Sequence, residues 1–254
     1  MASKNGSVFK QPYLAIRRNI GFLAMALPFT VWIGALLIPP SVGVRSSISA
    51  YYHTEMRNVF VGILFSMGVF LFTYNPKFYD KSYGKGDQYL GMLAGVAAAM
   101  VALFPTPRDN WREIFPPAPY DEGAYGVIHF IAAGVLFGSM VYFSYFLFTE
   151  TKPGKRIRRG SIKAKRNRVY RAMAVVMLLC MLLIGVYFVT GFAPISPDVL
   201  AKFPPVFFLE WAAIWAFGIS WSVKGEALEQ ITDRAKRLGR EAIKLRKQMG
   251  LRLH

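Results

Sequence analysis

The chain has 254 residues, of which 54% are hydrophobic, 15% aromatic and only 18% charged, yet its net charge is +17. Soluble domains carry about 25% charged residues, and a nucleic-acid-binding protein would place its cations on a polar fold. The composition therefore excludes an ordinary soluble domain, argues against nucleic acid as a partner, and favours a multi-pass membrane protein with basic loops.

Six apolar runs follow one another along the chain. About 20 apolar residues cross a bilayer, and only a helix satisfies all backbone polar groups of such a segment in lipid. We therefore predict an all-α integral membrane six-helix bundle over residues 1–223. Its spans lie at about 20–38, 59–74, 89–104, 124–149, 170–192 and 206–223. The second and third runs are short and would extend by a turn into their flanks.

The distribution of Lys and Arg predicts the orientation of these spans. The N-terminal segment, the second and fourth connections and the C-terminal tail hold 26 of the 31 Lys and Arg residues, and the other connections hold five. Cytoplasmic loops carry the excess of positive charge. Both termini are therefore predicted to be cytoplasmic (N-in/C-in), and we expect a protein of the bacterial inner membrane.

The most basic connection, residues 152–171, is expected to anchor this topology. Clusters of Lys and Arg next to a span attract anionic lipids of the cytoplasmic leaflet. Anionic headgroups at the cytoplasmic face are therefore predicted partners of the chain.

Residues 224–254 read as a basic amphipathic helix in the cytoplasm. Apolar residues recur there at alternating steps of three and four: Leu228, Ile231, Ala235, Leu238, Ala242, Leu245 and Met249. One interpretation is a coiled coil, which would make the protein a homo-oligomer through 228–249. The other is a helix that lies on the inner leaflet with its basic residues at the lipid phosphates.

Two G-x-x-x-G motifs, Gly91/Gly95 and Gly134/Gly138, lie in the third and fourth runs. Small residues four positions apart let two membrane helices approach closely. We expect both motifs to serve packing within the chain rather than dimerisation.

The connection of residues 46–58, SSISAYYHTEMRN, is unusual for its length. A connection that only turned would use Gly, Pro, Asn or Asp, whereas this one gathers hydroxyl, aromatic, acidic and basic groups at the mouth of a span. Its candidate ligand-binding residues are Ser49, Tyr52, His53, Glu55 and Arg57.

Three further candidates are predicted at the same extracytoplasmic end. Asp109 follows the third span, His129 lies about one and a half turns into the fourth, and Glu210 lies about one turn into the sixth. Ionisable groups within spans usually face the bundle interior or a water-filled cavity. The sequence therefore predicts a polar pocket that binds a lipid or a partner membrane protein, in a regulatory, scaffold or subunit role.

The same residues allow two chemical hypotheses for a membrane-embedded lipid hydrolase or transferase. His53 and His129 with a carboxylate such as Glu210 would make a zinc site with an open position for water. No H-x-x-x-H or H-E-x-x-H motif accompanies them. Metal-free acid–base catalysis by His53, Glu55, His129 or Glu210 is the second hypothesis.

A structural alternative assigns no chemistry to these groups. Glu210 would form an ion pair with Arg57, Arg108 or Arg112, and His129 would form a hydrogen bond across helices. Together they would hold the outer ends of the bundle.

A family likeness lies around the first connection. The first span ends in prolines, and Ser47-Ile48-Ser49, Glu55 and the Val59-Phe60-Val61-Gly62 start of the second span follow. In this arrangement the chain resembles FRAG/DRAM-type six-helix membrane proteins and uncharacterised bacterial six-span membrane families. The resemblance implies an N-in/C-in bundle with a role in lipid handling or membrane regulation, and it supplies no catalytic residues.

A looser similarity is to ceramidase-like membrane hydrolases, which use Ser, His and Asp around zinc. Ser49 and His53 have a comparable spacing in this chain. The paired histidines of a later helix have only His129 as a counterpart.

Overall fold

A computed structural model describes residues 10–39, 43–75, 85–108, 121–151, 157–191, 199 and 203–226. Asp109 and the heptad segment 228–249 lie outside these described residues, as does most of the predicted cytoplasmic helix.

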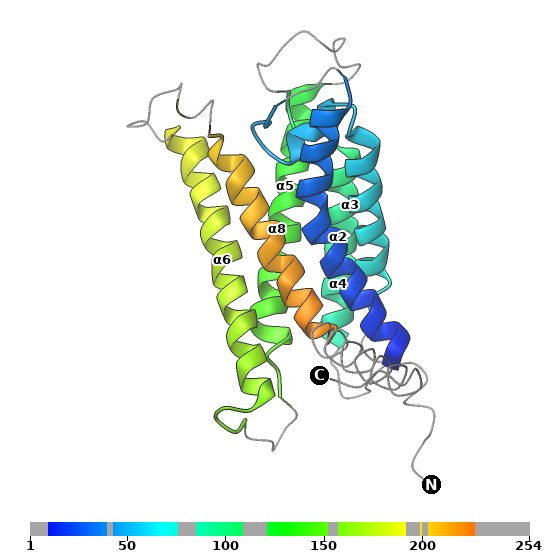
Figure 1. The fold of residues 1–254 in the computed structure, drawn as a ribbon, viewed down its shortest axis with the longest axis vertical. Coiled ribbons are helices and arrows are strands. Elements are labelled where there is room, and N and C mark those ends of the chain that lie inside the picture. Colours follow the sequence, from blue (N-terminus) through cyan, green and yellow to red (C-terminus); the bar gives the residue numbers. More distant parts are fainter. Residues whose placement is uncertain are drawn as a thin grey trace, which may run out of the picture.

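All regular secondary structure in the described ranges is helical, which confirms the all-α prediction (Figure 1). The elements are α2 (Lys10–Leu37), the 3-10 helix η1 (Ser49–His53), α3 (Arg57–Phe72), α4 (Lys85–Leu103), α5 (Glu122–Tyr142), the π-helix η3 (Phe143–Leu147), α6 (Ile162–Thr190) and α8 (Pro205–Lys224).

Five of these helices are long and apolar enough to cross a membrane: α2, α4, α5 with η3, α6 and α8. Helix α3 is equally apolar but has only 16 residues. At 1.5 Å per residue it is about 24 Å long, which is shorter than the roughly 30 Å hydrocarbon core.

The helices extend beyond the apolar runs, mostly at their N-terminal ends. Helix α2 begins at Lys10 and α6 at Ile162, about ten and eight residues before the predicted span boundaries. Hydropathy detects only the part of a helix that contacts lipid, whereas polar turns at its ends remain helical when their first N–H groups are capped. Ser161 supplies such a cap for α6, because its side chain accepts from the N–H of Ala164.

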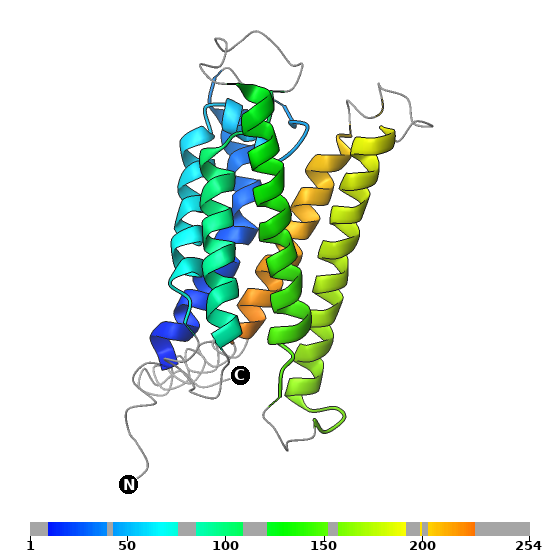
Figure 2. The same cartoon turned by 180° about the vertical axis from the view of Figure 1, so that it is seen from behind.

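The bundle divides into two packed groups that share α2. Helix α3 packs on α4 and α4 on α5, while α8 packs on α2 and on α6. Helix α6 lies at the edge of the bundle and is its least buried long helix (Figures 1 and 2). The connection after α2, the end of α4 and the first turn of α5 lie at the same end of the bundle, here called the outer end (Figure 1).

The closest helix approaches occur at glycines, and only one of the two G-x-x-x-G motifs takes part. A Cβ on Gly95 would meet the backbone of α3 at 2.5 Å, at Phe72 N. Gly21 of α2 is packed equally tightly, since its Cβ would lie 2.6 Å from the Gly218 carbonyl oxygen of α8. Gly134 and Gly138 face open space, so the expectation of packing within the chain is wrong for the second motif.

Replacing Gly95 by Ala should therefore destabilise the fold, because backbone atoms of α3 cannot move aside as a flexible side chain can. Overpacking of this kind costs about 1–3 kcal/mol. Gly138→Ala is the matched control, since it lies in the other motif and meets nothing within 4 Å. Thermal unfolding in detergent should show a lower midpoint for Gly95→Ala alone, and equal midpoints for the two variants would contradict the packing.

Candidate functional site

The unusual connection of residues 46–58 folds onto the outer end of the bundle as η1 and the start of α3. Ser47 stabilises the start of η1 from two residues before it, because its Oγ accepts from the N–H of Ala50 at 2.9 Å. Thr54 likewise precedes α3, and its Oγ1 accepts from the N–H of Met56 at 3.1 Å. The side chain of Tyr51 has no exposed surface. The connection is therefore a packed layer, not an open mouth.

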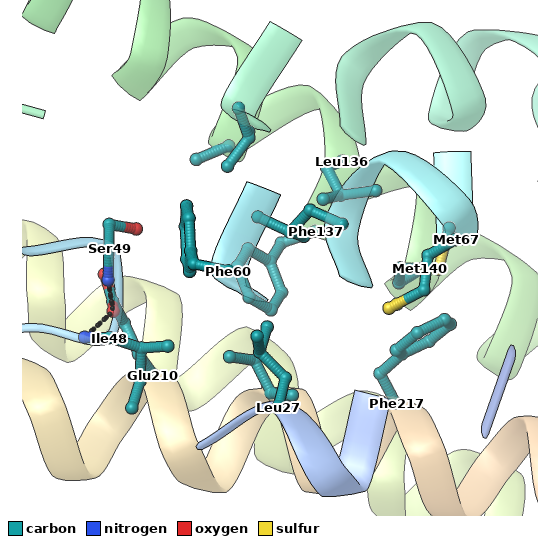
Figure 3. Close-up of a pocket in the computed structure, with 14 residues that line it drawn as sticks. Leu27, Ile48, Ser49, Phe60, Met67, Leu136, Phe137, Met140, Glu210 and Phe217 are labelled. Atoms are coloured by element: carbon teal, nitrogen blue, oxygen red, sulfur yellow. Dashed lines mark hydrogen bonds between the residues drawn. The ribbon is translucent and has the colours of Figure 1, made fainter. Parts of the chain in front are cut away.

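Glu210 ties this layer to α8. Its Oε2 accepts from the N–H of Ile48 at 2.7 Å and from the N–H of Ser49 at 3.3 Å (Figure 3). Of the Arg partners that the structural alternative names for Glu210, Arg57 donates to the Tyr52 hydroxyl at 2.7 Å and Arg108 donates to Glu122 at 2.7 Å, while Arg112 lies outside the described residues. Glu210 thus fixes η1 at the end of the connection from α2.

Both candidate histidines bind the F-P-T-P-R segment (residues 104–108), which follows α4. His53 Nε2–H donates to the carbonyl oxygen of Thr106 at 2.6 Å, and His129 Nδ1–H donates to that of Phe104 at 2.7 Å. A carbonyl oxygen only accepts, so these nitrogens carry the proton. The two prolines of the segment have no N–H and end the helix, and its carbonyls must find donors elsewhere.

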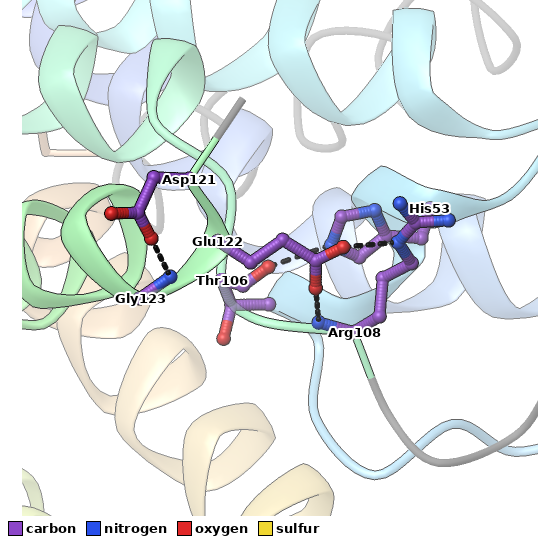
Figure 4. A network of polar contacts seen from close by, with 6 residues as sticks. All are labelled: His53, Thr106, Arg108, Asp121, Glu122 and Gly123. Carbon is purple, nitrogen blue, oxygen red and sulfur yellow. Dashed lines mark hydrogen bonds and ion pairs between the residues drawn. The ribbon is translucent and has the colours of Figure 1, made fainter. Parts of the chain in front are cut away.

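One face of α5 holds the F-P-T-P-R segment in place (Figure 4). Glu122, Gly126 and His129 share this face, because steps of four and three residues return to one side of a helix. Glu122 accepts from the backbone N–H of Arg108 at 3.1 Å and from its Nε at 2.7 Å. Gly126 leaves room for Pro107, whose ring a Cβ would meet at 2.5 Å.

The remaining candidates are not drawn into one centre. Glu55 is exposed and forms no hydrogen bond or ion pair with the residues that the structure describes. Tyr52 contacts Arg57, whose guanidinium lies 4.5 Å from the centre of its ring, and also the ring of His53. These contacts hold the turn between η1 and α3 together.

The zinc hypothesis requires His53, His129 and a carboxylate at one point. Within the described ranges, no three His, Cys, Asp or Glu side chains are grouped so that they could hold a metal ion. Glu210 is bonded to η1, whereas the two histidines are bonded to the F-P-T-P-R segment. The described residues therefore do not fit a zinc site.

A largely apolar cavity lies beside Glu210 in the middle of the bundle (Figure 3). It encloses about 610 Å³ of empty space, including the part that is open to the surroundings. Its walls are formed by Leu27, Ile48, Ser49, Phe60, Leu64, Met67, Val101, Ala133, Leu136, Phe137, Met140, Glu210, Ile214 and Phe217. Of the predicted ligand-binding residues in the described ranges, Ser49 and Glu210 line it.

The sequence did not reveal a second group of buried charges at the opposite, inner end of the bundle. Arg17 of α2 is 2% exposed and donates to the Tyr74 hydroxyl at 2.6 Å. Asp87 of α4 is 3% exposed, and the charges of Glu150, Lys224 and Arg17 act on it. Lys224 donates to the Phe148 carbonyl oxygen at 3.1 Å. Their positions near the ends of helices were the available signal, but Arg17 and Lys224 were counted with the loops when the orientation was predicted, and Asp87 was not considered.

Comparison with known proteins gives no relative for this chain. No family model matches it, and neither a curated protein nor a solved structure shows significant similarity. The resemblance to FRAG/DRAM-type proteins therefore stays a prediction.

Replacing His129 by Leu should lower the free energy of unfolding by about 1–3 kcal/mol, because a carbonyl loses its donor in a buried environment. Asn should retain most of the stability, since its Nδ2 reaches the position of the donating Nδ1. Gln places its amide at the Nε2 position and should rescue less. Thermal unfolding in detergent measures all three variants. Equal losses of stability for Leu and Asn would refute a stabilising role of the hydrogen bond from His129 to the Phe104 carbonyl oxygen.

Ionisation of Tyr51 should lower the free energy of unfolding at alkaline pH. Burial raises its pKa to about 12 from 10.0, against the opposing effects of the Arg45 N–H and charge. The unfolded state then ionises first, so the contribution is complete below pH 10 and is lost as the pH rises toward 12. The difference in free energy of unfolding between wild type and Tyr51→Phe should therefore shrink over this range. The ionisation of every other group affects both proteins alike and cancels in this difference. A constant difference would contradict the assignment.

Proposed function

We propose that this protein binds the apolar chain of a membrane lipid in the cavity beside Glu210. The observation that carries the proposal is the division of the cavity into apolar walls and one polar end, formed by Ser49 and Glu210. A lipid has the same division between chain and headgroup. Its chain would fill apolar space, and its headgroup would meet the polar end.

The dimensions of the cavity support a chain that lies along the helices. Its lining extends from Ala133 to Met140 on α5 and from Glu210 to Phe217 on α8. Seven residues at 1.5 Å each give about 10 Å of depth. Several methylene groups of one chain would therefore be enclosed.

We further propose that all six helices cross a bacterial inner membrane with both termini in the cytoplasm. The presence of 26 of the 31 Lys and Arg residues in the N-terminal segment, the second and fourth connections and the C-terminal tail supports this orientation. A short helix such as α3 can cross when the bilayer thins locally or flanking residues reach outward. The polar end of the cavity would then lie on the extracytoplasmic side, and anionic headgroups would meet the basic segment 152–171.

Lipid binding accounts for the candidate residues better than lipid hydrolysis does. Catalysis would need groups that converge on one bond of the substrate. His53 and His129 are instead bonded to the F-P-T-P-R segment, and Glu210 is bonded to η1. We therefore assign the protein a regulatory, scaffold or subunit role in which bound lipid is part of the structure.

A photoactivatable lipid tests this proposal. The protein in phosphatidylcholine nanodiscs is irradiated with a lysolipid whose chain carries a diazirine, and labelled peptides are mapped. Adducts on cavity-lining residues of α5 and α8 should saturate and be displaced by unlabelled lysolipid. Ala133→Trp fills the cavity and should abolish them, whereas Ile131→Trp, on a residue that is 63% exposed, should not. Labelling of outward-facing residues alone would overturn the proposal.

A further inference from the structure

We propose that one anionic phospholipid binds at the seam between α5 and α6, the line along which residues 130–145 meet residues 171–188. Its phosphate would contact Arg168 and Arg171 at the inner end, and one acyl chain would lie along the seam. This site is separate from the cavity, whose lining contains no residue of α6. It assigns residues to the proposed contact of anionic headgroups with segment 152–171, and it rests on that part of the proposed function.

Two exposed arginines, Arg168 and Arg171, lie near the inner end of α6. Residues three positions apart are neighbours on a helix surface, so their guanidinium groups can meet one ligand. Neither forms a hydrogen bond or an ion pair with another described residue, whereas Arg166 is paired with Glu226 at 3.7 Å. A guanidinium binds phosphate oxygens through paired N–H donors. The two arginines are therefore available for a phosphate.

Aromatic side chains place Arg171 at the depth of the lipid headgroups. Its guanidinium carbon lies 5.8 Å from the centre of the Tyr145 ring, which belongs to η3. Tyr142 and Phe146 lie at the same end of the bundle and are about half exposed. Exposed aromatic residues of membrane helices are enriched at the boundary between hydrocarbon and headgroups. A phosphate at Arg171 would therefore lie where a lipid carries its own charge.

Contacts between α5 and α6 mark the two ends of the seam (Figure 2). Arg171 meets Tyr145 at the inner end, and the ring centres of Phe130 and Phe188 are 5.3 Å apart toward the outer end. At 1.5 Å per residue, the part of α5 and η3 between these contacts is about 20 Å long. One leaflet contributes about 15 Å to the hydrocarbon core. The seam is therefore long enough for an acyl chain.

Glycines leave the seam unfilled between these contacts. Gly134 and Gly138 of α5 and Gly185 of α6 are exposed, and a Cβ on any of them would meet nothing within 4 Å. Leu178 lies seven residues from both Arg171 and Gly185, so it shares their side of α6, and it is 46% exposed. Apolar surface with room for a chain thus continues from the arginines.

The charges favour a lipid over a second copy of the chain in the seam. Small residues four positions apart also suit contact between two helices. A second copy in the same orientation would bring its own Arg168 and Arg171 to the same level, and like charges across an interface are unfavourable. An anionic lipid brings the opposite charge instead.

Native mass spectrometry of the whole protein tests the site. The protein in dodecyl maltoside is equilibrated with equal amounts of phosphatidylglycerol and phosphatidylcholine that carry the same chains, and the retained lipids are counted. One phosphatidylglycerol should be retained at least about tenfold more often than phosphatidylcholine, since each basic residue near an anionic headgroup contributes about fivefold. Arg168→Gln combined with Arg171→Gln should reduce this preference to about threefold or less.

A matched control removes the same charge from the same basic segment. Arg158 and Arg159 are exposed and precede α6, and their double replacement by Gln should leave the preference unchanged.

A second pair of variants tests the place of the chain. Gly138→Leu puts a side chain into the seam and should reduce the retention of phosphatidylglycerol at least about threefold. Gly62→Leu, at an exposed glycine of α3 with equally open surroundings, should not.

The outcomes separate this site from a general attraction of anionic lipid. Equal losses in the two double arginine variants would overturn the site and leave the proposed contact with segment 152–171 intact. No preference for phosphatidylglycerol in the wild type would overturn both. Unchanged retention in Gly138→Leu would overturn the seam as the place of the chain. A two-chain species that this variant dissociates would assign the seam to a second copy and overturn the proposal.

Discussion

Backbone carbonyls at the ends of membrane helices are the constraint on which this structure depends. The last carbonyls of a helix have no partner within it, and lipid supplies no donor. Here neighbouring helices supply them. His53 and His129 cap the segment that follows α4. Beyond η3, Lys224 of α8 donates to Phe148, and α6 donates in the same way from Asn167 to the next carbonyl. Polar side chains that look catalytic in the sequence are therefore held by helix ends, and this explains why so few of them reach the cavity.

Much of the fold followed from the sequence because it depends on local composition. Apolar runs gave every long helix, since lipid permits no other backbone structure. The predicted helix ends were less accurate because polar turns give no hydropathy signal. Helix α2, for example, begins at Lys10, well before the predicted span. The G-x-x-x-G motifs show the same limit from another side. Gly95 meets a neighbouring backbone and Gly138 meets nothing, although both stand in the same local pattern. Which helix lies opposite a motif is decided by the packing of the whole bundle.

The site was predicted in its location and not in its contacts. The first connection and the ends of α5 and α8 do meet at one end of the bundle, which alternation of antiparallel helices implies. The bonds of Glu210 to Ile48 and Ser49 join residues more than 160 positions apart. Nothing in either segment specifies that register. The burial of Arg17 was missed for a related reason, because a cation near a predicted span boundary was counted with the loop, although its side chain is buried.

The same caps that fix the helix ends also explain why a cavity exists. At the outer end of the bundle, α5 is bonded to the end of α4 through His129, and at the inner end the chain just after η3 is bonded to α8 through Phe148 and Lys224. Between these points α5 and α8 do not pack closely on each other, and both line the cavity. One turn beyond Phe217, the Trp221 ring contacts that of Phe217 and lies 5.3 Å from the ring of Phe148. The cavity thus lies between the hydrogen bonds of Glu210 at one end and a cluster of packed aromatic side chains at the other, and both belong to the packing of the fold itself.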